Sequence, residues 1–126
     1  MAYRPTEAAP FVVLVVEDEP LIRMSAVDLV EEAGFIAIEA ANADEAMSCL
    51  GQKTEISALF TDVDMPGSMD GLELARTISR SRPDIRVIIG SGHRKVTPED
   101  LPRGALFFSK PYDLPRLTEA LKKLVS

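Results

Sequence analysis

Short apolar runs alternate with helix-forming segments along the chain, and this alternation limits the possible folds more than any other feature. The run FVVLVV at 11–16 is continuously apolar, which is typical of a strand covered on both faces. Shorter apolar runs follow at 35–40, 56–60, 85–90 and 105–108. Strands that alternate with helices in this way predict a single α/β domain with a five-stranded parallel sheet and helices on both faces.

Helix-start signals follow four of the five predicted strands, at Pro20, Asn42, Asp70 and Asp113. Asn42 and Asp70 each have a glutamate three residues later, the pattern of a capping box. In the first helical segment, Leu21, Met24, Val27 and Val30 or Ala33 recur at helical spacing before Gly34 ends the pattern. We therefore expect this stripe to face the core, and we interpret the methionines in general as core residues.

The segment between the fourth and fifth predicted strands has room for only a short helix. Thr97 can cap a helix and Pro98 can start one, but Pro102 disfavours a helical residue before it and removes an amide donor. The fourth helix should therefore be about one turn long. A segment this short makes a poor symmetric interface, so we expect a monomer or a weak dimer.

Composition narrows the class of protein. The chain has 126 residues, a net charge of -6 and 46% hydrophobic residues, which is typical of one globular domain. We expect this domain at 11–126, after a leader at 1–10. The acidic balance argues against nucleic-acid binding, and Arg80, Arg82, Arg86, Arg94 and Lys95 are interpreted as a solvated basic face. The single Cys49 fits a reducing compartment, and no apolar run is long enough to span a membrane. We expect a cytoplasmic protein.

Polar residues follow four of the five predicted strands, at the point where each strand ends. Glu17 and Asp18 end the first, Asp62 the third, Ser91 the fourth, and Lys110 the fifth. Sites in open parallel sheets gather beyond the carboxyl ends of the strands, where the strand order reverses. We therefore expect these side chains to form one site.

Three carboxylates at one place repel each other unless a cation neutralises them. Mg²⁺ prefers oxygen ligands, commonly one or two carboxylates with waters and a phosphate oxygen. Asp18 and Asp62 suit as direct ligands, with Glu17 holding a coordinated water and the Asp64 backbone carbonyl as a further ligand.

The same site suits phosphoryl transfer. Lys110 supplies a positive charge and Ser91 a hydroxyl donor for the oxygens of a phosphoryl group. Asp62 can then act as a nucleophile and form an aspartyl phosphate. The bend at 65–67 is expected to keep the backbone clear of the reacting carboxylate.

Four motifs, VVEDEP, FTDVDMPGSMDG, GSG and SKPY, together resemble the receiver domain of bacterial two-component response regulators over about 12–124. The resemblance implies a flavodoxin-like doubly wound sheet of strand order 2-1-3-4-5, with Asp62 as the phosphoacceptor and Glu17 and Asp18 as the acidic metal-binding pair. It also implies Ser91 and Phe107 as a switch pair, and a bond between Lys110 and Pro111 that is often cis.

The resemblance further implies function and partners. The donor would be a sensor histidine kinase or a histidine phosphotransfer protein, and the phosphorylated form would signal to a downstream protein by a conformational change. Such a chain is not a conventional enzyme, although it catalyses its own Mg²⁺-dependent phosphorylation and dephosphorylation. It is either a stand-alone regulator or part of a larger one.

Several residues depart from the commoner pattern. The loop MPGSMDG has one extra residue, and Gly90 and Gly92 flank Ser91, which predicts a looser switch loop or a tight turn. His93 either tunes the site or is an exposed loop residue, and Tyr112 is interpreted as a packing residue rather than a ring at the lip of the site.

Two other functions are consistent with parts of the sequence. Asp62-Val63-Asp64 resembles the DxD nucleophile of haloacid-dehalogenase-type phosphohydrolases, but that family has DxD on its first strand and a later acidic pair. The second alternative is a receiver-like interaction module that works without phosphorylation. Such modules usually lose the acceptor, an acid or the lysine, and this chain has all of them.

Overall fold

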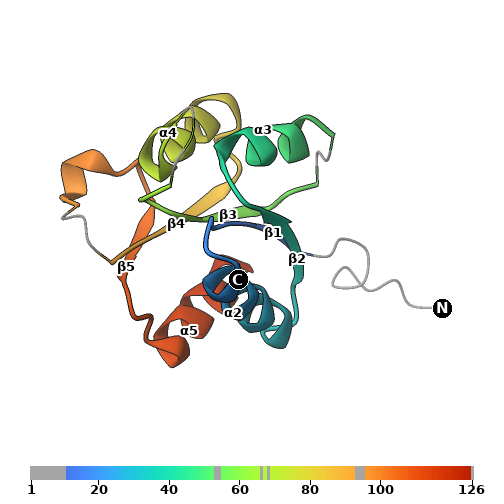
Figure 1. Cartoon of the computed structure of the whole chain (residues 1–126). Helices are drawn as coiled ribbons and strands as arrows, with labels where there is room; N and C mark the ends of the chain where they lie inside the picture. The colour runs from blue at the N-terminus through green and yellow to red at the C-terminus, as the bar shows by residue number, and fades with distance from the viewer. Residues whose placement is uncertain (1–10, 53–54, 66, 68, 93–95, 126) are drawn as a thin grey trace.

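The fold is a five-stranded parallel sheet between two layers of helices (Figure 1). The structure, a computed structural model, describes residues 11–52, 55–65, 67, 69–92 and 96–125. The strands are β1 (Val12–Val16), β2 (Ile36–Ala40), β3 (Ala58–Asp62), β4 (Arg86–Ser91) and β5 (Leu106–Ser109). Their order in the sheet is β2-β1-β3-β4-β5, and every neighbouring pair is parallel. This arrangement confirms the predicted fold class and strand order.

Four α-helices cover the sheet, two on each face, as Figure 1 shows. They are α2 (Pro20–Glu32), α3 (Ala43–Gln52), α4 (Gly71–Ser81) and α5 (Leu114–Val125). Helices α3 and α4 pack on one face and α2 and α5 on the other. Alternate residues of β1 therefore enter different cores, with Leu14 on the α3 side and Val15 on the α2 side. Burial on both faces explains why this strand is continuously apolar.

The predicted helix starts hold, with small shifts in the ends of elements. Asp70 Oδ1 accepts a hydrogen bond from the Glu73 amide at 2.9 Å, and Asn42 Oδ1 accepts one from the Glu45 amide at 2.9 Å. The Glu45 carboxylate in turn accepts from the Ala41 amide at 2.7 Å. These contacts satisfy amides that a helix leaves free in its first turn.

The predicted core face of α2 is wrong at its first two residues, Leu21 and Met24, and confirmed at Val30, which is buried. Leu21 is 78% exposed and Met24 is 58% exposed, whereas the buried residues of the helix are Ala26, Leu29 and Val30. The buried residues recur at i, i+3 and i+4, and this stripe includes the predicted Val30 but neither Leu21 nor Met24. The interpretation of the methionines as core residues is therefore also wrong for Met24.

The fourth helix is a single 3₁₀ turn, η1 (Pro98–Asp100), which confirms that it is short. The Thr97 amide and hydroxyl both donate to Asp100 Oδ2 at 3.0 Å. Arg76 of α4 donates to the Asp100 carbonyl oxygen from Nη2 at 2.8 Å and from Nε at 3.2 Å. One arginine thus fastens η1 to the neighbouring helix.

Among the described residues, no helix combines the length and apolar character needed to cross a membrane.

Candidate functional site

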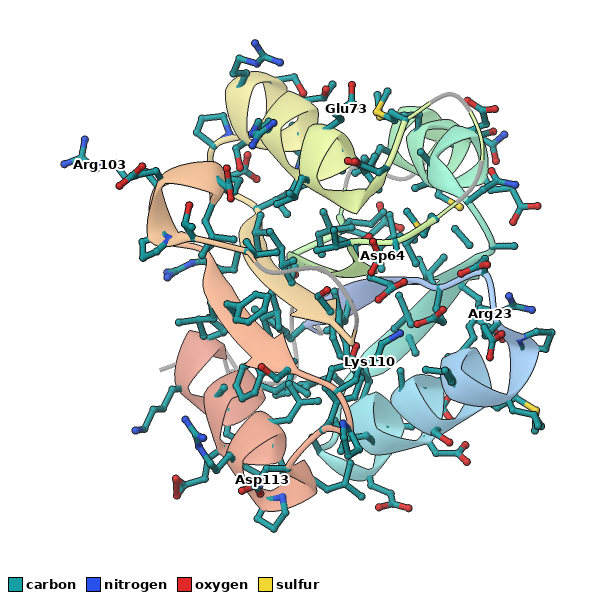
Figure 2. All side chains as sticks on the ribbon, turned by 60° about the vertical axis from the view of Figure 1, so that its left-hand side comes forward. Arg23, Asp64, Glu73, Arg103, Lys110 and Asp113 are labelled. Carbon is teal, nitrogen blue, oxygen red and sulfur yellow. The ribbon has the colours of Figure 1, made fainter. Side chains whose placement is uncertain are left out.

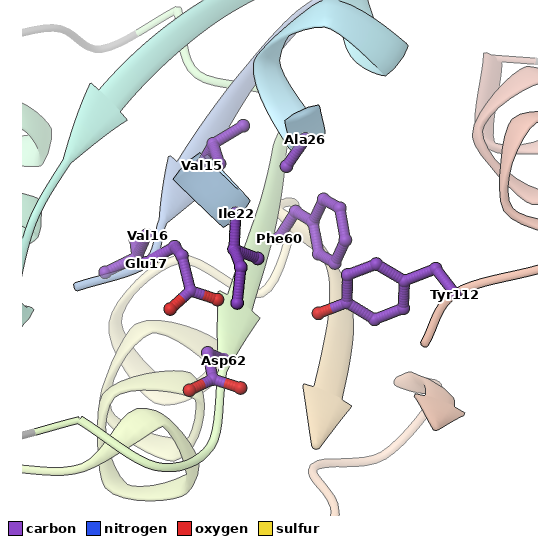
Figure 3. Close-up of a pocket in the computed structure, with 8 residues that line it drawn as sticks. All are labelled: Val15, Val16, Glu17, Ile22, Ala26, Phe60, Asp62 and Tyr112. Atoms are coloured by element: carbon purple, nitrogen blue, oxygen red, sulfur yellow. The ribbon is translucent and has the colours of Figure 1, made fainter. Parts of the chain in front are cut away.

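Three carboxylates meet at the carboxyl ends of β1 and β3, the adjacent strands at the centre of the sheet. Ligand oxygens of Glu17, Asp18 and Asp62 all lie within 4.8 Å of one another. Glu17 and Asp62 are only 3% and 4% exposed, while Asp18 is partly exposed. Figure 3 shows the Glu17 and Asp62 carboxylates side by side at the ends of their strands. The structure thus brings together three residues that lie up to 45 positions apart in the sequence, as the predicted convergence of strand ends requires.

Lys110 joins two of these carboxylates from the loop after β5. Its Nζ lies 2.9 Å from Glu17 Oε1 and 2.8 Å from Asp62 Oδ1. The first contact is a hydrogen bond, and the second is an ion pair without the alignment of a hydrogen bond. The Lys110 amide also donates to the Ser91 carbonyl oxygen at 2.9 Å, which holds the loop against β4.

Burial and the contacts between Lys110 and the carboxylates shift the pKa values of this site in opposite directions. Burial raises the pKa of Asp62 and of Glu17, and the contact with Lys110 opposes that rise in each. Burial opposes the charge of Lys110, but its contacts with Asp62 and Glu17 outweigh burial and raise the pKa of the ammonium group. One ammonium therefore balances only part of the charge of three carboxylates.

The residues present fit a hard divalent cation. Three carboxylates supply oxygen ligands at one place, and Asp62 Oδ1 is buried with no aligned hydrogen bond among the described residues. A cation there would offset the repulsion that Lys110 leaves. The side chain of Asp64 is not part of this cluster, because its Oδ2 faces the Ser91 hydroxyl at 3.4 Å. The role predicted for the Asp64 carbonyl stays a prediction.

The predicted switch residues lie on neighbouring strands. Ser91 ends β4 and is 4% exposed, and it lies next to the site because β4 pairs with β3. Phe107 is on β5, opposite Ile89 of β4, and packs against the core on the α3 and α4 side. The peptide bond between Lys110 and Pro111 is cis, as expected. His93 lies outside the described residues, as do two residues of the loop at 65–71 that has the extra position.

Gly71 is a residue of the site that sequence reasoning missed. A Cβ at this position would overlap the Asp62 carbonyl and crowd the backbone of Val63. The Gly71 amide donates to the Val63 carbonyl oxygen at 2.9 Å. The missing side chain lets the first residue of α4 touch the backbone of the acidic residue that ends β3. The only sequence signal was a glycine directly after the cap residue Asp70.

Tyr112 lies behind the carboxylates. Its ring packs on Phe60 with 5.4 Å between the centroids, which agrees with the packing role expected for it. The ring also lines a cavity of about 10 Å³ together with Glu17 and Asp62, as Figure 3 shows. A Cβ at Gly90 would overlap the Tyr112 hydroxyl. Gly90 is therefore a buried residue of the predicted fourth strand that leaves space for the phenol, while the looseness expected of the loop around Ser91 stays a prediction.

Arg23 of α2 supports the backbone at the end of β1. Its Nη1 donates to the Glu17 carbonyl oxygen at 2.8 Å, and its Nε donates to the Glu39 carboxylate at 3.2 Å. No motif marks this arginine, because the contact joins a helix to a strand end and is visible only in the folded chain.

Comparisons with known proteins agree with the geometry. The family model of the response regulator receiver domain matches residues 13–122. The response regulator receiver protein CpdR of Brucella abortus is 34% identical over 116 residues, which cover 90% of this chain and 95% of that protein. The sensor kinase CckA of the same organism is also 34% identical, but the match covers only 12% of the kinase.

A solved structure shows the same fold. The response regulator receiver protein from Pseudomonas putida superposes with a TM-score of 0.82 at 33% identity, and the match covers 92% of this chain and 98% of that one. The chain thus spans most of some relatives and a small part of others. The sequence, the sheet topology and the clustered acids agree, and the chain belongs to the response regulator receiver domain family.

Proposed function

We propose that Asp62 accepts a phosphoryl group from the phosphohistidine of a sensor histidine kinase or a histidine phosphotransfer protein. The chain has a phosphoacceptor receiver role in two-component signalling, as its family does. The assignment to Asp62 rests on one observation: a buried carboxylate that lies within 4.8 Å of two others and is contacted by an ammonium group.

The chemistry follows from the groups around Asp62. One oxygen of its carboxylate bonds to phosphorus while the phosphorus–nitrogen bond of the donor breaks, and the electron pair of that bond stays on the imidazole. Lys110 Nζ, now 2.8 Å from Asp62, can pair with the new phosphoryl oxygens, and the Ser91 hydroxyl can donate to another. Because these groups are already in place, positioning contributes much of the rate.

We propose Mg²⁺ as the cofactor, held by Asp18 and Asp62, with Glu17 acting through a water and the Asp64 carbonyl as a further ligand. When bound, Mg²⁺ supplies positive charge to the oxygens of the transferring phosphoryl group. Glu17 and Asp62 are kept in position without it by Lys110. One solved relative, the TrrA response regulator of Thermotoga maritima, is described as a complex with Mg²⁺ and BeF.

An apolar hollow beside Lys110 supports a protein as the phosphodonor. Its volume is about 640 Å³, and Leu21, Pro111 and Leu114 line it together with Lys110. Leu21 and Leu114 are 78% and 55% exposed. Exposed apolar side chains grouped next to a polar site are typical of a protein-binding surface. The donor would then place its phosphohistidine over Asp62 while part of its surface covers this hollow.

After transfer, Ser91 and Phe107 are proposed to form the switch that signals to a downstream protein. Residues 11–126 would form the receiver and 1–10 a leader. A cytoplasmic location without nucleic-acid or membrane partners is in line with the free Cys49 and the net charge of -6.

Intact-mass measurement tests the proposal. The protein is incubated with acetyl phosphate and Mg²⁺, beside Asp62→Asn and the control Asp64→Asn, which keeps its backbone carbonyl. We expect one labile phosphate on the wild-type protein and on Asp64→Asn, none on Asp62→Asn, and none when EDTA replaces Mg²⁺. A wild-type protein that takes up no phosphate would favour the interaction module. The family assignment removes the haloacid-dehalogenase alternative.

A further inference from the structure

A groove with four arginines lies at the amino end of β4, away from the acidic site. It consists of two adjoining hollows of about 660 and 280 Å³, both of which Ser79 and Arg103 line. The arginines are Arg76, Arg80, Arg86 and Arg103, and all four are exposed. We call this surface the basic groove. Arg86 begins β4 and Ser91 ends it, so the two sites are roughly 16 Å apart along the strand.

The positive charge of the basic groove contrasts with the rest of the molecule. The chain has 20 acidic and 14 basic residues, excluding histidine, for a net charge of -6. The acidic residue that lines the groove, Asp84, is held by Arg82, whose Nη2 lies 2.9 Å from Asp84 Oδ2 and whose Nε lies 3.1 Å from Oδ1. This pair is neutral, so the charges of Arg80, Arg86 and Arg103 remain available to a ligand.

Two of the arginines differ in how they are held. Arg76 is fixed by its two hydrogen bonds to the Asp100 carbonyl, which orient its guanidinium group without neutralising it. Arg103 projects away from the body of the molecule between η1 and β5, as Figure 2 shows. The groove therefore has one arginine that is held by the backbone and one that extends into solvent.

Part of the lining of the groove is apolar. Pro83 and Pro102 line it, and Ile85 and Val87 contribute apolar atoms from the start of β4. At Gly104 a Cβ would meet nothing within 4 Å, so the groove is open there. Apolar residues and guanidinium groups that line the same groove suit a peptide that has carboxylates beside an apolar side chain. It suits a nucleic acid poorly, because a long polyanion would meet the acidic remainder of the surface.

We propose that the basic groove binds an acidic segment of a partner protein, in an extended conformation, with aspartate or glutamate side chains flanking an apolar residue. The carboxylates pair with Arg80, Arg86 and Arg103, and the apolar residue enters the space over Pro83 and Gly104. This surface is separate from Asp62 and goes beyond the proposed phosphotransfer function. It offers a downstream partner a contact that phosphorylation does not create.

The test uses the full chain and three fluorescent probes: a glutamate-rich peptide with a central leucine, the same peptide with glutamine for glutamate, and an oligothymidine. Arg86→Glu/Arg103→Glu reverses two charges of the groove. Arg116→Glu/Lys123→Glu makes the same charge change at a hollow next to α5 and serves as the control. Uptake of phosphate from acetyl phosphate shows that each variant is folded.

We expect the glutamate peptide to bind the wild-type protein and the control alike, and the groove variant about tenfold more weakly, as reversal of two exposed ion pairs implies. Amide NMR shifts on binding should centre on Ser79, Asp84 to Val87 and Gly104. The proposal is overturned if the peptide does not bind, if both double variants bind equally, or if the glutamine peptide or the oligothymidine binds as tightly.

Discussion

At Asp62, burial and the surrounding charges act against each other. The side chain is almost fully buried beside two other carboxylates, and Lys110 is the one cation that contacts it among the described residues. Burial raises its pKa above the ordinary 3.8, so the folded protein holds a proton on Asp62 more tightly than the unfolded chain does. Without metal, the ionised carboxylate therefore lowers stability.

This difference predicts how Asp62→Asn changes stability with pH. In metal-free buffer at neutral pH the variant should be at least as stable as the wild-type protein, because the amide removes a buried charge. As pH falls toward 3.8 the wild-type carboxylate takes up its proton and the difference should shrink. Thermal unfolding in EDTA at several pH values measures this. A wild-type protein that gains stability over the variant as pH rises would contradict the account.

Gly90 and Tyr112 form a second pair that can be tested at the residue scale. Gly90→Ala should lower the free energy of unfolding by about 1–3 kcal/mol, because the new methyl group overlaps the Tyr112 hydroxyl in a packed core. Tyr112→Phe should recover part of that loss, since it removes the oxygen that the methyl meets first. Urea denaturation of both single variants and the double variant gives the coupling energy. Additive effects would show that the two residues do not share this space.

The polar and charged residues at the strand ends were predictable from the sequence. The glycines that allow close packing, and Arg23, were not. Glu17, Asp18, Asp62, Ser91 and Lys110 each end or follow a strand, so their convergence follows from the topology rule alone. Gly71, Gly90 and Arg23 matter through contacts with elements distant in sequence. Their roles depend on tertiary packing, which no local pattern records.

At the scale of elements, Gly71 sets how closely α4 approaches the end of β3. Gly71→Ala should destabilise the fold by about 2 kcal/mol and slow phosphate uptake, because the Asp62 backbone must move. Gly51→Ala in α3 is the matched control: its Cβ meets nothing within 4 Å, so it should be neutral or stabilising by up to about 1 kcal/mol. Equal effects of the two substitutions in urea denaturation and phosphorylation rate would remove Gly71 from the site.

The element pattern predicted the kind and order of elements better than their orientation. The alternation of apolar and amphipathic segments predicted five strands, and Pro102 predicted a short η1. The face of α2 was mistaken at Leu21 and Met24, because they recur at helical spacing with the buried Val30, and periodicity does not say which members of a stripe meet the sheet. The exposed stripe instead lies partly beside the proposed donor surface.

For the whole molecule, the short η1 predicts weak self-association. Its three residues offer little surface beside β5, although Arg76 holds them in place. We expect a monomer, or a weak dimer at most, in both the unmodified form and the beryllofluoride–Mg²⁺ form. Sedimentation velocity across a concentration series measures this. A tight dimer that forms through η1, β5 and α5 would contradict the prediction.

Identification of the phosphorylated residue tests directly whether Asp62 is the phosphoacceptor. The protein is treated with acetyl phosphate and Mg²⁺ and then with sodium borohydride, which reduces an acyl phosphate to a primary alcohol, and its peptides are analysed by mass spectrometry. We expect an alcohol in place of the carboxylate at Asp62 and unchanged Asp18 and Asp64. Reduction at Asp18 or Asp64, or none in a protein that carries phosphate, would show that Asp62 is not the acceptor.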